Sequence, residues 1–412
     1  MTGTSVAGLP PKALQAALRH TTERLCSELA SPGSVPPDWS APEWIVARAA
    51  ARIHGIAPLL ASRLRWQGPE GWASFVEEES VDTQTRHLQV MELLRRLHER
   101  LRRAGVAAVP LKGAALYAAA LYGPGERPMA DVDLLVRSCD LETASATLQE
   151  LGFQESLRLW KNRLFRVSEP GDHAQTQEAC EDRVKVELHE RICEMLPVRL
   201  VDISASIFPR DAAPGVNPYP SRAALIAHLL LHAAGSIVDR ALRFIQLLDI
   251  AVLSDRATSE DWRAVFCIGQ EQQPPWWALP PLALTARYFP GRIPQQVLDT
   301  ARSCCPPALR RISKRQRISE VSLSYPWIGA FPAIGWIRSP GEALGYIAAR
   351  LVRGKEATSL RKLASSTEPG LSPKERHWLA ESQMTRILRW AVARPGRPLS
   401  MRAIRKAFGE PT

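Results

Sequence analysis

The chain has 412 residues, of which 45% are hydrophobic and 23% are charged, so it can form two or three globular domains that each bury a core. Its seven cysteines are odd in number and form no CxxC pair, which excludes a disulfide-rich scaffold and argues against structural zinc. We therefore expect reduced thiols in a cytoplasmic protein. The first residues lack a charged start followed by an apolar run, and no apolar segment reaches about 18 residues, so we expect neither a signal peptide nor a membrane span.

The net charge of +11 is unevenly distributed along the chain. Residues 310–412 contain 20 Lys and Arg against 7 Asp and Glu, whereas residues 1–309 contain 33 against 35. Such a basic tail is a solvated face, a docking surface for an acidic partner, or a nucleic-acid-binding segment. Its aromatic residues cluster with prolines and do not alternate with the basic residues, which argues against a base-stacking platform.

The N-terminal part of the chain is expected to be all-helical, because its apolar residues recur at helical spacing. Helices are predicted over residues 12–30, over 42–64 with a break at Gly55, and over 75–103; residues 31–42 form a proline-rich connector and 67–72 a loop.

From Val106 the pattern changes to short strands around helices. An apolar strand over residues 106–111 ends in Lys112-Gly113, a short helix follows over 114–122, and a second strand covers 129–136. A helix over 140–151, with Asp140 as its cap and Gly152 as its stop, precedes strands over 153–160, 163–168 and 183–189, with a hairpin loop over 169–182.

The second strand carries two acids, Asp131 and Asp133. Alternating side chains of a strand point to opposite faces, so both acids project the same way. Two carboxylates on one face repel each other unless a cation, usually Mg²⁺, lies between them. The alternative is a solvated strand edge that carries two acids without a function.

A third carboxylate is supplied by the strand over residues 183–189, where Glu187 faces opposite to Val186 and Leu188. Three acids on rigid strands suit a site with two metal ions about 3.5–4 Å apart, of the kind that transfers nucleotidyl groups. His189 shares the face of Glu187, and we place it at the nucleotide site as a hydrogen-bonding residue. An exposed strand acid is the alternative for Glu187.

Phosphate donors are expected beside these acids. Lys112 adds a positive charge between a strand and the start of a helix, where free N–H groups and Gly113 allow phosphate to approach the backbone. Arg127, four residues before Asp131, is in place to contact phosphate bidentately. The alternatives are a surface lysine at Lys112 and an ion pair of Arg127 with Glu126 or an aspartate.

Further helices complete the chain. They are predicted over residues 221–254, 261–270 and 279–289; residues 310–317 form a basic cluster, and 341–353 a basic amphipathic helix. The chain divides into five regions. They are an N-terminal helix with its connector (1–40), a helical region (41–105), an α/β core (106–196), a helical domain (197–305) and a basic, partly disordered C-terminal region (306–412). The fold class is α+β, a small mixed sheet flanked by helical regions.

These residues carry a resemblance to a known family. The chain resembles the uncharacterised nucleotidyltransferase family of the polymerase-β-like superfamily over about residues 40–265. The matching features are a strand that ends in LKG at residues 111–113, Arg127, DVDLLV at residues 131–136 and ELH at residues 187–189. Two positions depart from the superfamily: Lys112-Gly113 replaces its usual Gly-Ser, and Glu187 stands where Asp is commoner.

The resemblance also implies substrate-lining residues in the helices after residue 221, at His228, His232, Arg243 and Asp249. His228 and His232 lie four residues apart, as in a zinc pair, but Leu229 replaces the Glu of HExxH and no third ligand is evident. A packed or site-lining pair is therefore favoured. For Arg243 and Asp249, a salt bridge between helices is the alternative to substrate contact.

We therefore predict a metal-dependent nucleotidyltransferase that moves a nucleoside monophosphate from an NTP to an unidentified acceptor, which is a small molecule, a peptide or a protein. Asp131, Asp133 and Glu187 hold Mg²⁺, with two ions, and Glu187 takes the acceptor proton. Two alternatives remain: a degenerate member that binds nucleotide or a peptide without turnover, and a nucleic-acid-associated protein that uses its basic tail.

Overall fold

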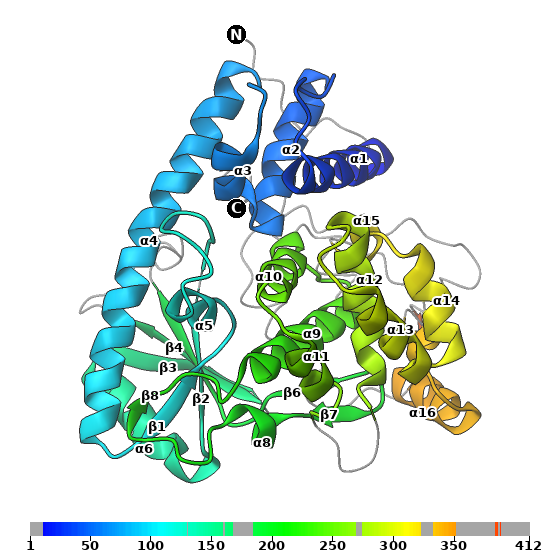
Figure 1. Cartoon of the computed structure of the whole chain (residues 1–412). Coiled ribbons are helices and arrows are strands. Elements are labelled where there is room, and N and C mark those ends of the chain that lie inside the picture. Colours follow the sequence, from blue (N-terminus) through cyan, green and yellow to red (C-terminus); the bar gives the residue numbers. More distant parts are fainter. Residues whose placement is uncertain are drawn as a thin grey trace.

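In the computed structural model of the chain, a group of N-terminal helices and one long helix stand beside a six-stranded sheet, and a second group of helices lies on the side of the sheet away from the long helix (Figure 1). The structure describes residues 11–129, 131–159, 161–167, 184–268, 274–322 and 333–351, together with residues 384, 385 and 388. This arrangement confirms the predicted α+β class with a mixed sheet and helical flanks.

The N-terminal part is helical, as predicted, with α1 (Pro11–Ala30), α2 (Ala41–His54), α3 (Ala57–Arg63) and α4 (Glu70–Arg103). The backbone N–H and hydroxyl of Ser40 donate to the Glu43 carboxylate at the start of α2. Gly55 ends this helix with a φ of 66°, a conformation that glycine adopts without steric cost. The predicted loop at residues 67–72 is shorter than expected, because α4 already begins at Glu70.

The main sheet has the strand order β3-β4-β5-β2-β1-β8. Its strands are β1 (Ala107–Pro110), β2 (Asp131–Val136), β3 (Phe153–Arg158), β4 (Asn162–Val167), β5 (Lys185–His189) and β8 (Gly215–Val216). β2 pairs with β5 and β1 with β8 in parallel, and the other neighbours are antiparallel. Helix α4 has 34 residues, about 51 Å at 1.5 Å per residue, and reaches from the N-terminal helices to β8 and β1 (Figure 1).

Two helices connect β1 to β2 and β2 to β3. Helix α5 (Lys112–Ala118) is shorter than the predicted helix and begins at Lys112 itself. Helix α6 (Leu141–Glu150) follows a 3₁₀ turn (Ser138–Asp140) and stops before Gly152, whose φ is 88°. Asp140 occupies the cap position, but the prediction that its side chain caps the helix is wrong, because its backbone is already helical and its carboxylate accepts no capping hydrogen bond.

Three short strands were missed by the sequence analysis. They are β8 of the main sheet and the two strands of a separate antiparallel pair, β6 (Cys193–Met195) and β7 (Leu200–Asp202). Strands of two or three residues are too short to show the alternation on which strand prediction relies. The region predicted as a helical domain, residues 197–305, therefore also contains the strands β7 and β8.

The predicted helix over residues 221–254 is two helices, α9 (Arg222–Asp239) and α10 (Phe244–Ser254), because the backbone turns at Arg240 with a φ of 60°. By length and composition α9 qualifies as a membrane span, but 72% of it is buried inside the molecule. Burial on that scale is expected of the central helix of a globular domain, so α9 is weak evidence for a span.

The remaining helices are α8 (Ser204–Ile207), α11 (Ser259–Val265), α12 (Leu279–Tyr288), α13 (Gln295–Cys304), α14 (Pro307–Arg315), α15 (Ile318–Val321) and α16 (Pro340–Leu351), with 3₁₀ turns at Trp276–Ala278 and Ile334–Trp336. Of these helices, α8, α11, α12 and α15 contact α9, and α13 and α14 contact α12. The predicted hairpin loop at residues 169–182, most of the aromatic cluster before residue 333 and nearly all of the tail after residue 351 lie outside the described residues. The five-region division of the chain stays a prediction.

Candidate active site

Two carboxylates of neighbouring strands lie side by side at the centre of the sheet. Asp133 of β2 is the direct register partner of Glu187 of β5, and the two strands run parallel. Paired residues of parallel strands project from the same face, and Asp131 lies two residues before Asp133 on that face. The structure therefore brings the three predicted acids to one face of the sheet.

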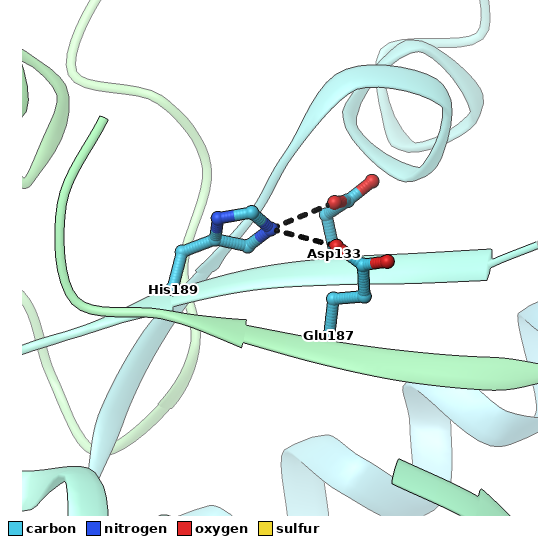
Figure 2. A group of neighbouring side chains, drawn as sticks. All are labelled: Asp133, Glu187 and His189. Atoms are coloured by element: carbon cyan, nitrogen blue, oxygen red, sulfur yellow. Dashed lines mark hydrogen bonds and ion pairs between the residues drawn. The ribbon is translucent and has the colours of Figure 1, made fainter. Parts of the chain in front are cut away.

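His189 forms a compact cluster with Asp133 and Glu187 (Figure 2). Its Nε2 lies 2.8 Å from Oδ1 of Asp133 and 3.5 Å from Oε2 of Glu187. The amide of Asn162, at the start of β4, donates to the same Oε2 at 2.6 Å. Although burial opposes a charge on His189, its hydrogen bonds to the two carboxylates raise the pKa of the imidazole. His189 thus acts as a donor that orients both acids.

Lys112 brings an ammonium group to the same acids. Its Nζ lies 2.8 Å from Oδ1 of Asp133, and its side chain is 24% exposed. Its φ of 50° falls in the left-handed region, which residues other than glycine rarely adopt. Next to this backbone, the hydroxyl of Tyr219 lies 2.6 Å from Nδ1 of His228.

The two aspartates of β2 differ in acidity. Burial and repulsion by Asp133 raise the pKa of Asp131 to about 6. Burial also disfavours charge on Asp133, but Lys112 and His189 outweigh it and hold the pKa of Asp133 well below its ordinary value. Asp133 is therefore ionised, and its charge disfavours ionisation of Asp131. A divalent cation between the two carboxylates would relieve the repulsion between them.

Arg127, which we predicted to contact phosphate, is held by Asp249 of α10. Its Nε and Nη2 donate to the two carboxylate oxygens at 2.8 and 2.7 Å. The hydroxyl of Tyr122 donates to the same carboxylate at 2.8 Å. The remaining nitrogen, Nη1, lies against Gly113, where a Cβ would be 2.3 Å from it. Gly113 is therefore needed for the close approach of Arg127, and only Nη1 is left for a ligand.

Arg243 offers a second guanidinium at the start of α10. Its Nε donates to the carbonyl of Ile53 at 3.0 Å, and the next residue, Phe244, donates its N–H to Nδ1 of His54 at 3.1 Å. Its Nη2 lies against Gly55, where a Cβ would be 2.5 Å away. Among the described residues, neither terminal nitrogen of Arg243 has a hydrogen-bond partner. The N-terminal helices thus hold this side chain and leave its terminal nitrogens for a ligand.

His228 and His232, one turn apart on α9, face the site with ring centroids 6.5 Å apart. Nδ1 of His232 lies 3.7 Å from Oε1 of Glu194, in β6. Burial, the largest influence on each ring, lowers the pKa of both imidazoles, so both are neutral at neutral pH. Within the described part of the chain, no third ligand groups with them. This geometry fits a site-lining pair and not a zinc pair.

Two cavities meet at Lys112 and His232, which line both of them. We name the first, of about 220 Å³, the arginine cavity, because Arg243 lines it together with Asp131, Asp133, Gly113, Arg127 and Asp249. We name the second, of about 160 Å³, the glutamate cavity, because Glu187 and Glu194 line it together with Lys161, Asn162, His189 and His228. The predicted site residues therefore surround two adjoining spaces.

Sequence reasoning missed four side chains of this site, Lys161, Asn162, Glu194 and Tyr219. Lys161 and Asn162 stand at the start of the strand that pairs with the strand of Glu187. Their position in the sequence could therefore have placed them at the site. Glu194 and Tyr219 stand in short or irregular segments that carry no periodic pattern. Only packing against α9 places them at the site.

The residues of the cluster fit a divalent cation. One ligand atom from each of Asp133, Glu187 and His189 lies within 4.8 Å of the others. Ligands of one Mg²⁺ lie at most about 4.2 Å apart, since each bond is about 2.1 Å. A small side-chain shift would bring the three atoms onto one ion, provided that Nε2 of His189 gives up the proton it donates to the carboxylates. Carboxylate oxygens suit Mg²⁺ or Mn²⁺, whereas imidazole favours transition metals. Asp131 stands outside this trio, beside Asp133.

The fold and the site define a protein with carboxylates on adjacent strands of a mixed sheet and a lysine at the strand-to-helix junction beside them. The family model of the uncharacterised nucleotidyltransferases matches residues 40–289, and the chain belongs to this family. Family membership supports a nucleotidyltransferase function, and with it a transferase enzyme that uses an NTP. Comparison with curated proteins and with solved structures gives no match.

Proposed function

We propose that the protein transfers a nucleoside monophosphate from an NTP to a hydroxyl group of an acceptor and requires Mg²⁺, with two ions bound. The supporting observation is the register pairing of Asp133 with Glu187, with the Lys112 ammonium 2.8 Å from Asp133. Acids held on two rigid strands beside a cation form a preorganised site for a metal–phosphate complex. We also propose that the protein acts in the cytoplasm.

The reaction makes one bond and breaks one. The acceptor oxygen bonds to the α-phosphorus, the bond from that phosphorus to the bridging oxygen of the β-phosphate breaks, and pyrophosphate leaves with the electron pair. Glu187 takes the proton of the acceptor hydroxyl. Bound Mg²⁺, held by Asp131, Asp133 and Glu187, would neutralise phosphate charge and make the hydroxyl more acidic. His189 and Asn162 keep the Glu187 carboxylate in place during the transfer.

The triphosphate would lie in the arginine cavity. Lys112 and Arg243 line this cavity and would serve as phosphate donors, and Nη1 of Arg127, beside Gly113, would add a third contact. Arg243 is the strongest of the three candidates, because its terminal nitrogens have no protein partner among the described residues, whereas Lys112 and Arg127 each pair with an aspartate. Helix α5 has only seven residues, so its dipole adds little.

A nucleotide-binding protein without turnover is the second candidate. It is favoured by one observation, that Asp133 and Asp249 already neutralise two of the predicted phosphate cations. A docking role of the basic tail stays a prediction; its described part includes four exposed basic residues of α14, Arg310, Arg311, Lys314 and Arg315.

Labelling with α-³²P-labelled NTPs in a cell extract tests the proposal. The purified protein with Mg²⁺ should move label onto an extract component and release pyrophosphate, and Asp133→Asn should abolish both. Glu150→Gln, on an exposed side chain of α6, is the matched control and should label normally. If the wild type binds ATP in calorimetry but yields no labelled product or pyrophosphate, the non-catalytic function holds instead.

A further inference from the structure

The glutamate cavity is a separate space beside the proposed triphosphate site. It opens on Glu187, which would take the acceptor proton, and it shares Lys112 and His232 with the arginine cavity. An acceptor in this cavity would therefore lie across the acid cluster from the triphosphate, as attack opposite the leaving pyrophosphate requires. Its volume of about 160 Å³ suits a small molecule.

Two carboxylates and one amide oxygen supply the hydrogen-bond acceptors of the cavity, beside three basic side chains. Glu194 presents a carboxylate that is 19% exposed. Asn162 donates its Nδ2 to Glu187, and its Oδ1 is buried with no hydrogen-bond partner among the described residues. A buried acceptor without a partner is costly, so a ligand that donates to it would stabilise the site.

The carboxylate of Glu194 is fixed in position but only loosely neutralised. The backbone of α9 passes so close that a Cβ at Gly235 would lie 2.8 Å from Cδ of Glu194. Lys161 stands 3.4 Å away, and the imidazole of His232, 3.7 Å away, is neutral at neutral pH. Both distances exceed those of a close ion pair, which are about 2.7–2.9 Å.

The other cations that line this cavity are engaged elsewhere. Lys112 pairs with Asp133 at 2.8 Å, and Arg191 pairs with Asp202 at 3.2 Å. Anionic groups of an acceptor would therefore meet Glu187 and Glu194 with little compensating charge. A ligand that carries donors and a positive charge matches the cavity better.

We infer that the glutamate cavity is the acceptor site and that the acceptor is a small hydroxyl compound with an ammonium group, which Glu194 binds while the hydroxyl faces Glu187. This inference rests on the proposed transferase function. Lys161 shifts towards solvent as the ammonium replaces it beside Glu194, and Asn162 Oδ1 accepts a hydrogen bond from the ligand. The cavity thus selects the acceptor by charge, and the arginine cavity selects the NTP.

The test uses the full-length protein, each of the α-³²P-labelled NTPs in turn, Mg²⁺ and a whole cell extract. The labelled product is cleaved with a phosphodiesterase, which leaves the ³²P in the nucleoside monophosphate, and the released acceptor is applied to a cation exchanger at neutral pH and detected by mass spectrometry. We expect it to be retained. Glu194→Gln, which keeps the shape and removes the charge, should lower labelling about tenfold or more without weakening ATP binding in calorimetry.

A second variant, Gly235→Ala, displaces the Glu194 carboxylate without removing it. It should also lower labelling, while ATP binding remains. The matched control is Gly71→Ala, where an added Cβ meets nothing within 4 Å. No labelled product from the wild type would contradict the transferase function itself. A labelled acceptor that is neutral, anionic or macromolecular would leave that function in place and overturn the acceptor assignment. Loss of ATP binding by Glu194→Gln in proportion to labelling would overturn it as well.

Discussion

Arg127 and Asp249, 122 residues apart in the sequence, form a buried bidentate ion pair that joins the loop before β2 to helix α10. The two side chains are 9% and 2% exposed, so neither charge is solvated. The pair therefore fixes the position of the helical group relative to the acid-bearing strand. It also sets where Arg243, at the start of the same helix, stands above the site.

We expect Asp249→Asn to lower the free energy of unfolding by about 3–5 kcal/mol, because it leaves the Arg127 charge buried without a counter-ion. Urea denaturation followed by circular dichroism measures the change. Asp299→Asn is the control, since its partner Arg302 is on the surface and exposed pairs contribute about 0–1 kcal/mol. A loss below about 1 kcal/mol at Asp249 would show that the pair is solvated or rearranged.

Gly113→Ala should destabilise the protein by about 1–3 kcal/mol through overpacking. The added Cβ would lie 2.3 Å from Nη1 of Arg127 and 2.7 Å from Sδ of Met129, and Asp249 prevents Arg127 from moving away. Gly71→Ala, in helix α4 with open space around it, should be stabilising by up to about 1 kcal/mol. Equal melting temperatures of the two variants would contradict the close approach.

His54 makes stability depend on pH. Burial, with repulsion by Arg243, lowers the pKa of His54 in the folded protein to about 3, whereas an unfolded histidine titrates near 6.5. Only the unfolded state takes up a proton between these values, so folding stability falls as the pH drops through this window. At pH 5 the loss is about 2 kcal/mol for one such group.

The variant His54→Gln isolates this effect, because glutamine does not titrate. The difference in unfolding free energy between wild type and variant should shrink by about 2 kcal/mol from pH 7 to pH 5, measured by urea denaturation at each pH. A difference that is constant over this range would mean that His54 titrates normally in the folded state.

Metal binding should stabilise the folded protein. At a Mn²⁺ concentration of 100 times the dissociation constant, the free energy of unfolding should rise by about 2.7 kcal/mol. Thermal unfolding and the electron paramagnetic resonance signal of free Mn²⁺ report this binding without any turnover. Asp133→Asn should remove the effect and Glu150→Gln should keep it. Stabilisation that survives in Asp133→Asn would place the ion elsewhere.

Lys112→Met should change metal and nucleotide affinity in opposite directions. Its ammonium stands 2.8 Å from Asp133 and repels a cation at the acid cluster, so its removal should strengthen Mn²⁺ binding. The same removal takes away a phosphate donor, so ATP binding should weaken by about tenfold. Calorimetry with each ligand measures both. A parallel loss of both affinities would indicate that Lys112 only supports the fold.

Several elements were predictable from short stretches of sequence. Helices α1 to α4 and strands β1 to β5 lie where periodicity placed them, because which side chains point inwards depends on spacing within one segment. The shared face of Asp131 and Asp133 follows from alternation along a single strand in the same way. The left-handed turn at Gly55 also has a local cause, the missing side chain.

Partners across the chain were not predictable in this way. An ion pair of Arg127 with an aspartate was one of the alternatives, and its partner is Asp249 of α10. A salt bridge between helices, the alternative to substrate contact for Arg243 and Asp249, does not form between these two residues. Arg243 is held instead by Ile53 of α2, from a region to which the sequence assigned no part in the site.

The sequence by itself determined the α+β class, the strands that carry the acids, and the common face of Asp131 and Asp133. Each of these depends on residues that are neighbours in the chain. Only the tertiary structure decided that Asp133 pairs with Glu187, that the terminal nitrogens of Arg243 stand at the site with no hydrogen-bond partner among the described residues, and that two cavities adjoin at Lys112. These relationships arise when strands and helices far apart in sequence pack together, and no local pattern encodes the register or partner that packing selects.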